Sequence, residues 1–216
     1  MQRRLNAALA ETLVKAAVVP VLTIGAADQG VGLARALVRG GLDLIEITLR
    51  TPAALEAIRR IRAEVPEARV GAGTVLSPEQ ADEAIAAGAR FIVSPGMTPR
   101  LIEAAERWPV PFLPGAATAS EAMALADLGY RVLKFFPAEP AGGAAYLKAL
   151  GAPLPGIAFC PTGGIDLANA RTYLALANVA AVGGSWVAPA RTLERGDWAA
   201  ITALAEEAAG LRRKSG

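Results

Sequence analysis

The chain has 216 residues, of which 53% are hydrophobic, 5% aromatic and 19% charged. This length suits a single domain with a large aliphatic core, and the high apolar content excludes a disordered chain. The 22 Lys and Arg residues against 20 Asp and Glu leave a formal charge of +2, without the basic block that binds a nucleic-acid backbone. We therefore expect a compact domain with no nucleic-acid partner.

The sequence contains no histidine and one cysteine, Cys160. A Ser-His-Asp triad, a Cys-His pair, a His-ligated zinc site and an intramolecular disulfide are all excluded. Cys160 has no basic neighbour in the sequence that would activate its thiol, so a small buried side chain is favoured over a nucleophile. Acid/base and nucleophilic chemistry is left to carboxylates, hydroxyls, tyrosines and the four lysines, which are Lys15, Lys134, Lys148 and Lys214.

Residues 1–16 predict an amphipathic leading helix, because Leu5, Leu9 and Leu13 recur at helical spacing among charged side chains. This segment lacks the apolar centre of a secretory signal. No stretch reaches the roughly 18 to 20 continuous apolar residues that span a bilayer. A soluble, cytoplasmic protein without a membrane partner is expected.

Short apolar segments alternate with helical patterns along the rest of the chain. The predicted strands are residues 17–24, 42–48, 69–74, 90–94, 111–114, 131–136, 157–161 and 179–182. Strands that are apolar on both faces and joined by helices indicate right-handed βαβ units in a parallel sheet. Eight such units favour an α/β fold made of a single (β/α)8 TIM barrel, which forms one domain over residues 1–216 and carries the leading helix as an extra element.

A doubly wound open sheet is the alternative fold. It would usually need fewer strands and a phosphate-binding fingerprint after the first one. The turn after the first predicted strand, Gly25-Ala26-Ala27, matches the G-x-G-x-x-G pattern poorly. The barrel is therefore preferred, and its chemistry should lie at the carboxyl ends of the strands.

Lys134 lies inside the apolar segment Val132–Phe136, where an ordinary packed strand would not place an ammonium group. Burial disfavours the charged form of a lysine and supplies a neutral amine that can attack a ketone. Alternation along the second strand puts Glu46 on one face with Leu44 and Thr48. If that face points inward, the carboxylate meets the lysine, either as a structural salt bridge or as a proton shuttle, and we favour the shuttle.

Other strand ends suggest anion binding. Arg50 and Thr74 follow the second and third strands, and a guanidinium with a hydroxyl suits a substrate carboxylate. A rim ion pair for Arg50 and a helix N-cap for Thr74 are the alternatives. After the seventh and eighth strands, Gly163-Gly164 and Gly183-Gly184, with Ser185, resemble the backbone cradle in which barrels bind phosphate.

Six segments of the chain resemble 2-dehydro-3-deoxy-6-phosphogluconate (KDPG) aldolases. Any one would be weak evidence, but all six occur in the right order, and the likeness runs from about Val18 to the last helix. The segments are residues 46–51 (EITLRT), 70–76 (VGAGTVL), 91–96 (FIVSPG), 134–139 (KFFPAE), 159–165 (FCPTGGI) and 183–186 (GGSW).

This resemblance implies a metal-independent class I aldolase that needs no cofactor and cleaves KDPG to pyruvate and glyceraldehyde 3-phosphate, typically as a homotrimer. It also implies a role for each matching residue. Lys134 would form the Schiff base and Glu46 would act as the general acid/base. The substrate-binding residues would be Arg50 and Thr74 for the pyruvate carboxylate, Gly163, Gly164 and Ser185 for the phosphate, and Thr162, Pro95 and Phe136 as lining of the pocket.

Two other functions remain as alternatives. Another phosphate-binding barrel, such as an isomerase or epimerase, would use Lys134 only electrostatically, and a non-catalytic barrel would simply bind an anionic metabolite. Within the aldolase interpretation, the substrate could be KDPG, its C4 epimer or the unphosphorylated 4-hydroxy-2-oxoglutarate (KHG).

Overall fold

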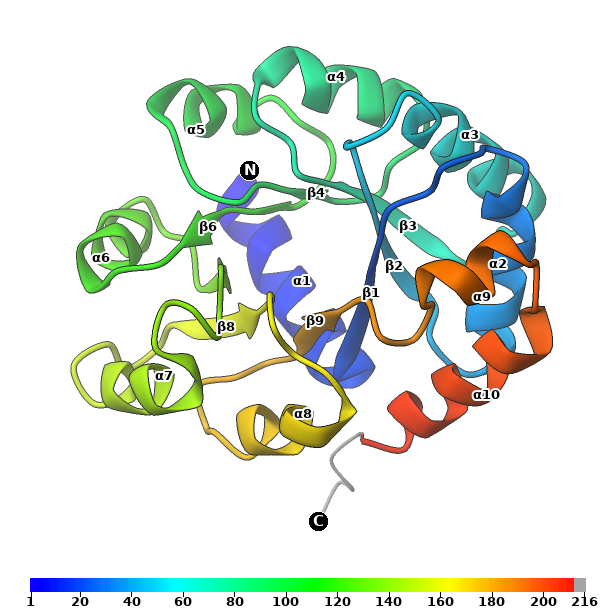
Figure 1. Cartoon of the computed structure of the whole chain (residues 1–216). Coiled ribbons are helices and arrows are strands. Elements are labelled where there is room, and N and C mark those ends of the chain that lie inside the picture. The colour runs from blue at the N-terminus through cyan, green and yellow to red at the C-terminus, as the bar shows by residue number, and fades with distance from the viewer. Residues whose placement is uncertain (212–216) are drawn as a thin grey trace.

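The computed structural model describes residues 1–211 and places parallel strands around a common centre, with helices outside them (Figure 1). Lys214 lies outside the described residues. The strands are β1 (Val18–Leu22), β2 (Leu44–Thr48), β3 (Arg69–Gly73), β4 (Ile92–Val93), β5 (Phe112–Leu113), β6 (Gly115–Ala116), β7 (Val132–Phe135), β8 (Ala158–Pro161) and β9 (Val182–Gly184). The helices are α1 (Gln2–Ala16), α2 (Gln29–Arg39), α3 (Ala54–Glu64), α4 (Pro78–Ala86), α5 (Pro99–Ala105), α6 (Ala119–Asp127), α7 (Gly143–Gly151), α8 (Leu167–Leu174), α9 (Ala190–Glu194) and α10 (Trp198–Ala209).

The strands form two parallel sheets, which confirms the expected alternation of strands and helices. One sheet has the order β5-β4-β3-β2-β1-β9 and the other the order β6-β7-β8. Isolated parallel bridges, Phe159 with Val179 and Thr162 with Gly183, connect the β8 side of the smaller sheet with the β9 side of the larger one. None of the helices within residues 1–211 is both long and apolar enough to cross a membrane.

Most predicted strands contain the observed ones with longer ends, but the fifth and the last were placed wrongly. The fifth predicted strand, residues 111–114, continues past Pro114 as β6, so that β5 pairs with β4 while β6 pairs with β7. The last strand is β9 rather than residues 179–182, because Gly183 and Gly184 pair with β1 through their backbones alone. A prediction from hydrophobicity selects the apolar residues before these glycines. The strand itself is defined by main-chain hydrogen bonds, which glycine can form without an apolar side chain.

Side chains of β2 alternate between two separate cores. Ile45 and Ile47 belong to the large cluster between the strands and the surrounding helices. Leu44 faces the other way, into an inner cluster of buried residues: Leu9, Leu13, Ala16, Val19, Leu44, Phe91, Val93, Leu113, Val132, Cys160, Ala180 and Ala181. Glu46 and Thr48 follow Leu44 by alternation, so the predicted inward face is confirmed.

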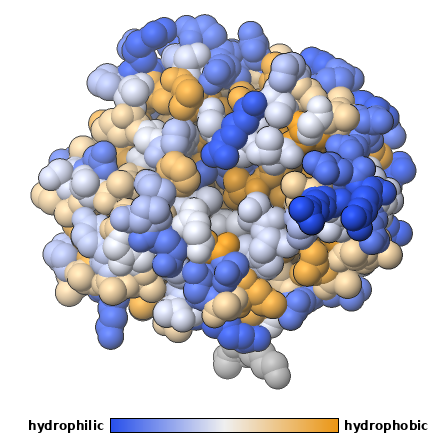
Figure 2. All heavy atoms as spheres, viewed as in Figure 1, coloured by the Kyte–Doolittle hydropathy of each residue, from blue (hydrophilic) through white to orange (hydrophobic). Residues whose placement is uncertain are grey.

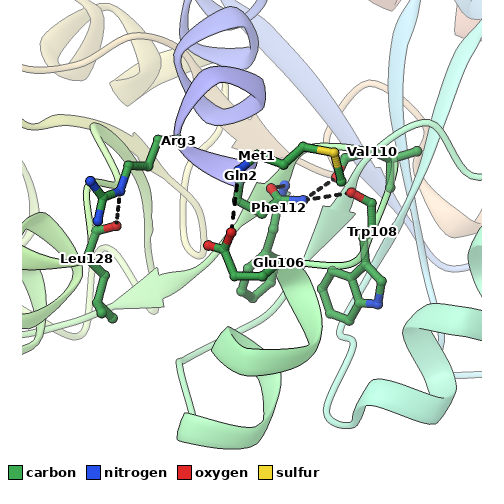
Figure 3. Close-up of polar contacts among 8 residues, drawn as sticks. All are labelled: Met1, Gln2, Arg3, Glu106, Trp108, Val110, Phe112 and Leu128. Carbon is green, nitrogen blue, oxygen red and sulfur yellow. Dashed lines mark hydrogen bonds and ion pairs between the residues drawn. The ribbon is translucent and has the colours of Figure 1, made fainter.

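The predicted leading helix, α1, is confirmed, and it packs against the inner cluster. In Figure 1 it lies behind β9, across the middle of the molecule. Leu9 and Leu13 contribute to the inner cluster, and two fully buried amides, Gln2 and Asn6, bind strand backbone. Figure 3 shows the Gln2 amide donating to the carbonyls of Trp108 (3.2 Å) and Val110 (2.9 Å), just before β5.

Asn6 joins β5 to β7. Its Nδ2 donates to the carbonyls of Phe112 (3.1 Å) and Val132 (3.0 Å), and its Oδ1 accepts from the backbone N–H groups of Arg131 (2.8 Å) and Val132 (3.0 Å). Buried backbone groups need such partners, because each one left unpaired costs free energy. One side chain thus satisfies the backbone at the seam between the two sheets.

Replacing Asn6 should therefore destabilise the fold. Asn6→Leu keeps a similar volume but removes four buried hydrogen bonds, and we expect the free energy of unfolding to fall by about 3 kcal/mol or more. The exposed Glu11→Ala on the same helix should change it by no more than about 0.5 kcal/mol. Urea unfolding of the three proteins measures both values, and equal midpoints for Asn6→Leu and the native chain would contradict this role.

Candidate active site

Lys134 and Glu46 meet inside the molecule. Lys134 lies on β7 and Glu46 on β2, and the lysine Nζ is 3.2 Å from the glutamate Oε1. Only 6% and 4% of these two side chains are exposed. The expected contact between a buried amine and a buried carboxylate is present, and it connects the smaller sheet to the larger one.

Small neighbours give the lysine room in its strand. Lys134 pairs in register with Gly115 of β6 and Cys160 of β8, neither of which has a large side chain. The ring of Phe136 lies 5.4 Å from Nζ, measured to its centroid, within the range of a cation–π contact. The backbone of Pro95 packs against Gly115, the neighbour of Lys134. A Cβ on Gly115 would lie only 2.2 Å from the Pro95 carbonyl oxygen.

Gly73 makes the space that the Glu46 carboxylate occupies. A Cβ at this position of β3 would lie 1.9 Å from Glu46 Oε1, much closer than any real contact. Gly73 lies near the end of the predicted strand 69–74, and the sequence pattern predicts no function for it. The position of Gly73 in the strand could have indicated this role. In the parallel pairing of β2 with β3, Gly73 is opposite Thr48, which is the next inward-facing residue after Glu46.

Arg50 and Thr74 lie together at the ends of β2 and β3. Arg50 Nε donates to Thr74 Oγ1 at 3.2 Å, and within residues 1–211 the guanidinium has no carboxylate partner. Thr74 has a φ of 59°, a left-handed conformation that costs free energy for a β-branched residue. Ser77, not Thr74, is the N-cap of α4. The two sequence alternatives, a rim ion pair and a helix cap, are thus wrong.

The two glycine pairs converge where β8 and β9 end. Gly163 and Gly164 have φ values of 102° and 79°, which favour glycine. Thr162, just before them, bridges to Gly183, and a Cβ on Gly183 would lie 2.3 Å from the Thr162 hydroxyl. Ser185 follows β9 and is exposed. These residues come together at the same edge as Arg50 and Thr74.

Thr23 is a residue of this edge that sequence reasoning missed. It follows β1, is exposed, and its hydroxyl is 2.8 Å from that of Thr48. Thr48 also donates to the Leu22 carbonyl at 3.1 Å. Period-two alternation from Val19 through Val21 to Thr23 was the signal that could have placed it on the inner face.

Cys160 is a packing residue, as expected. It is buried in the inner cluster, and burial, reinforced by the charge of Glu46, raises the pKa of its thiol to about 12. Because the thiolate is the reactive form, this thiol is a poor nucleophile.

The edge brings together a buried amine, a buried carboxylate, a guanidinium and a glycine turn with positive φ values. The amine of Lys134 and the carboxylate of Glu46 are buried, the Arg50 guanidinium bonded to Thr74 lies at the ends of β2 and β3, and the Gly163-Gly164 turn and the glycines of β9 lie at the ends of β8 and β9. Figure 2, viewed as in Figure 1, shows hydrophilic and hydrophobic side chains intermingled over this face of the molecule.

Comparison with known proteins identifies the family. A family model described as KDPG and KHG aldolase matches residues 9–204. The chain belongs to the KDPG and KHG aldolase family. The 2-dehydro-3-deoxy-phosphogluconate aldolase of Dickeya dadantii (strain 3937) is 54% identical over 191 residues, which cover 88% of this chain and 90% of that protein.

Two solved structures of family members resemble this one closely. The KDPG aldolase of Legionella pneumophila, with pyruvate captured at low pH as a covalent carbinolamine intermediate, has a TM-score of 0.88 and 42% identity, covering 91% of this chain and 96% of that one. The Zymomonas mobilis ZM4 aldolase with 3-phosphoglycerate has a TM-score of 0.89 and 46% identity, covering 95% and 97%. The fold of this chain is therefore that of the aldolase family.

Gly73→Ala should separate the buried pair. Its methyl group would take the place of Glu46 Oε1, so we expect the carboxylate to move and the Lys134–Glu46 distance to exceed the 3.2 Å seen here by at least about 1 Å. Gly25→Ala is the matched control, since a Cβ there meets nothing within 4 Å. Crystal structures of both variants measure the distance, and an unchanged ion pair in Gly73→Ala would contradict this account of the glycine.

Proposed function

We propose that this chain is a class I aldolase that cleaves KDPG to pyruvate and D-glyceraldehyde 3-phosphate through a Schiff base on Lys134. One observation carries the proposal. In a member of the aldolase family, the amine of a buried lysine lies 3.2 Å from a buried carboxylate, in the half of the molecule where the strand ends carry Arg50 and the two glycine pairs. No cofactor or metal is needed for this chemistry, because the iminium itself accepts the electrons.

We further propose that the two sheets form one closed (β/α)8 barrel and that the chain is a single domain. Only Pro114 separates β5 from β6, so the two short strands can be read as one barrel strand that pairs on both sides. The bridges Phe159–Val179 and Thr162–Gly183 support closure on the other side. In such a barrel the active site lies at the carboxyl ends of the strands, where the candidate residues are found.

The reaction follows from the positions of the two groups. Glu46 takes a proton from the Lys134 ammonium, and the neutral amine attacks C2 of the keto acid. Glu46 returns this proton to the oxygen to give a carbinolamine, which then loses water to form an iminium. Glu46 removes the proton of the C4 hydroxyl while the C3–C4 bond breaks. The electron pair of the C3–C4 bond moves through C3 to the iminium nitrogen, so that the aldehyde leaves and an enamine remains. Protonation at C3 and hydrolysis by water then release pyruvate and regenerate the amine.

The remaining residues bind the two ends of the substrate. Arg50 and Thr74 take the carboxylate next to C2, and the Gly163-Gly164 turn with Ser185 takes the phosphate. Support comes from the relatives with pyruvate held covalently and with 3-phosphoglycerate bound. Thr162, Pro95 and Phe136 would line the space between these ends.

KHG is the second substrate that we propose. It shares the 4-hydroxy-2-keto acid that reacts with Lys134 but has no phosphate, and the family description includes it. We also propose that the enzyme is a cytoplasmic homotrimer, as the resemblance implies. An isomerase or epimerase would use Lys134 without a covalent bond, so covalent trapping separates these functions from the aldolase.

Trapping with pyruvate and borohydride tests the proposed function. Reduction of the iminium should leave a stable pyruvate-derived adduct on Lys134, detected by intact mass and located by peptide mapping. Lys134→Ala should lose the adduct and turnover, while the matched Lys148→Ala, at an exposed position on α7, should keep both. A folded, active native enzyme that gives no adduct would refute the Schiff-base mechanism.

A further inference from the structure

Glu139 and Tyr173 form a hydrogen bond beside the glycine turn, and neither residue has a role in the chemistry above. Glu139 ends the segment KFFPAE, after β7, whereas Tyr173 lies on α8. The Tyr173 hydroxyl donates a hydrogen bond to Glu139 Oε1. This contact links the segment that follows β7 with the C-terminal end of α8.

The backbone of Glu139 is tied directly to the turn. Its N–H donates to the Gly163 carbonyl at 3.0 Å, and the preceding Ala138 N–H donates to the Thr162 carbonyl at 2.8 Å. The Glu139 side chain also packs against Gly164, the second residue of the turn. A Cβ on Gly164 would lie 2.7 Å from the Cβ and Cγ of Glu139. Glu139 therefore supports the turn by both its backbone and its side chain.

The Tyr173 contact fixes where the Glu139 carboxylate lies. A carboxylate near a phosphate site would repel the ligand unless it were directed elsewhere. Here its Oε1 lies at the start of α7, 3.5 Å from the position of a Cβ on Gly143, where the helix dipole favours negative charge. Burial and the Glu139 carboxylate also raise the pKa of the Tyr173 hydroxyl, so it keeps its proton and remains a donor at neutral pH.

We propose that Glu139 and Tyr173 are positioning residues that hold the Gly163-Gly164 turn in the shape that receives the substrate's phosphate. The pair thereby sets the preference of the enzyme for phosphorylated over unphosphorylated 4-hydroxy-2-keto acids. This inference rests on the proposed function, because it assumes that the turn binds phosphate and that Lys134 acts on the keto group. It predicts an effect on KDPG that KHG, which has no phosphate, does not share.

The test is the ratio of kcat/KM for KDPG to kcat/KM for KHG. Removing one hydrogen bond to a charged group in Tyr173→Phe should lower this ratio about five- to tenfold, through a higher KM for KDPG rather than a lower kcat. Glu139→Ala, at an exposed position, should lower it by at least as much. Glu139→Gln retains an acceptor for the tyrosine and should keep the ratio within about twofold of the native value.

Tyr146→Phe is the matched control. Tyr146 lies on α7 with its ring stacked on Phe135, and within residues 1–211 the structure gives its hydroxyl no hydrogen bond. The ratio should not change in this variant. A native ratio in Tyr173→Phe, or a ratio in Glu139→Gln as low as in Glu139→Ala, would overturn the inference.

The two proposals fail in different ways. Trapping of pyruvate on Lys134 does not involve phosphate, so its absence in the native enzyme would refute the proposed function. An adduct that forms normally, together with an unchanged KDPG-to-KHG ratio in Tyr173→Phe, would refute the positioning role alone.

Discussion

The buried pair of Lys134 and Glu46 is the interaction around which the site is built. Removing two charges from water is costly, and mutual attraction offsets this cost only when the geometry is good and the pair is well surrounded. Here the surroundings are specific: Gly73 leaves space for the carboxylate, and Phe136 offers a ring face to the amine. A pair that is costly to bury yet is closely accommodated supports the proposed chemical role over a purely stabilising one.

The rest of the fold keeps this pair in place. The amine comes from the smaller sheet and the carboxylate from the larger one, so the distance between them depends on how the sheets are held together. Asn6 of α1 bonds the backbone at one seam, and the bridge of Thr162 to Gly183 lies at the other. The seam at Thr162 also adjoins the Gly163-Gly164 turn, so the bridge between the sheets and the proposed phosphate site share the same backbone.

Sequence reasoning found the parts of the site that follow from strand periodicity. A lysine in an apolar strand and a glutamate on an alternating inward face could both be identified, and they meet as expected. It missed Thr23, which the same alternation along β1 could have placed, and the other residues that it missed depend on contacts between distant segments. Gly73 is needed only because the Glu46 carboxylate lies where its Cβ would be, and the Glu139–Tyr173 bond joins residues 34 positions apart. The last strand was misplaced for a related reason, since Gly183 and Gly184 pair through backbone that has no hydrophobic signature.

The central claim is that Glu46 moves protons for a covalent intermediate on Lys134. Exchange of the pyruvate methyl protons with deuterated water, followed by NMR, measures this step without the aldehyde or the phosphate. The account predicts rapid exchange in the native enzyme and a rate at least about 100-fold lower in Glu46→Gln. Exchange at the native rate in Glu46→Gln would contradict the account, because another group would then be carrying the proton.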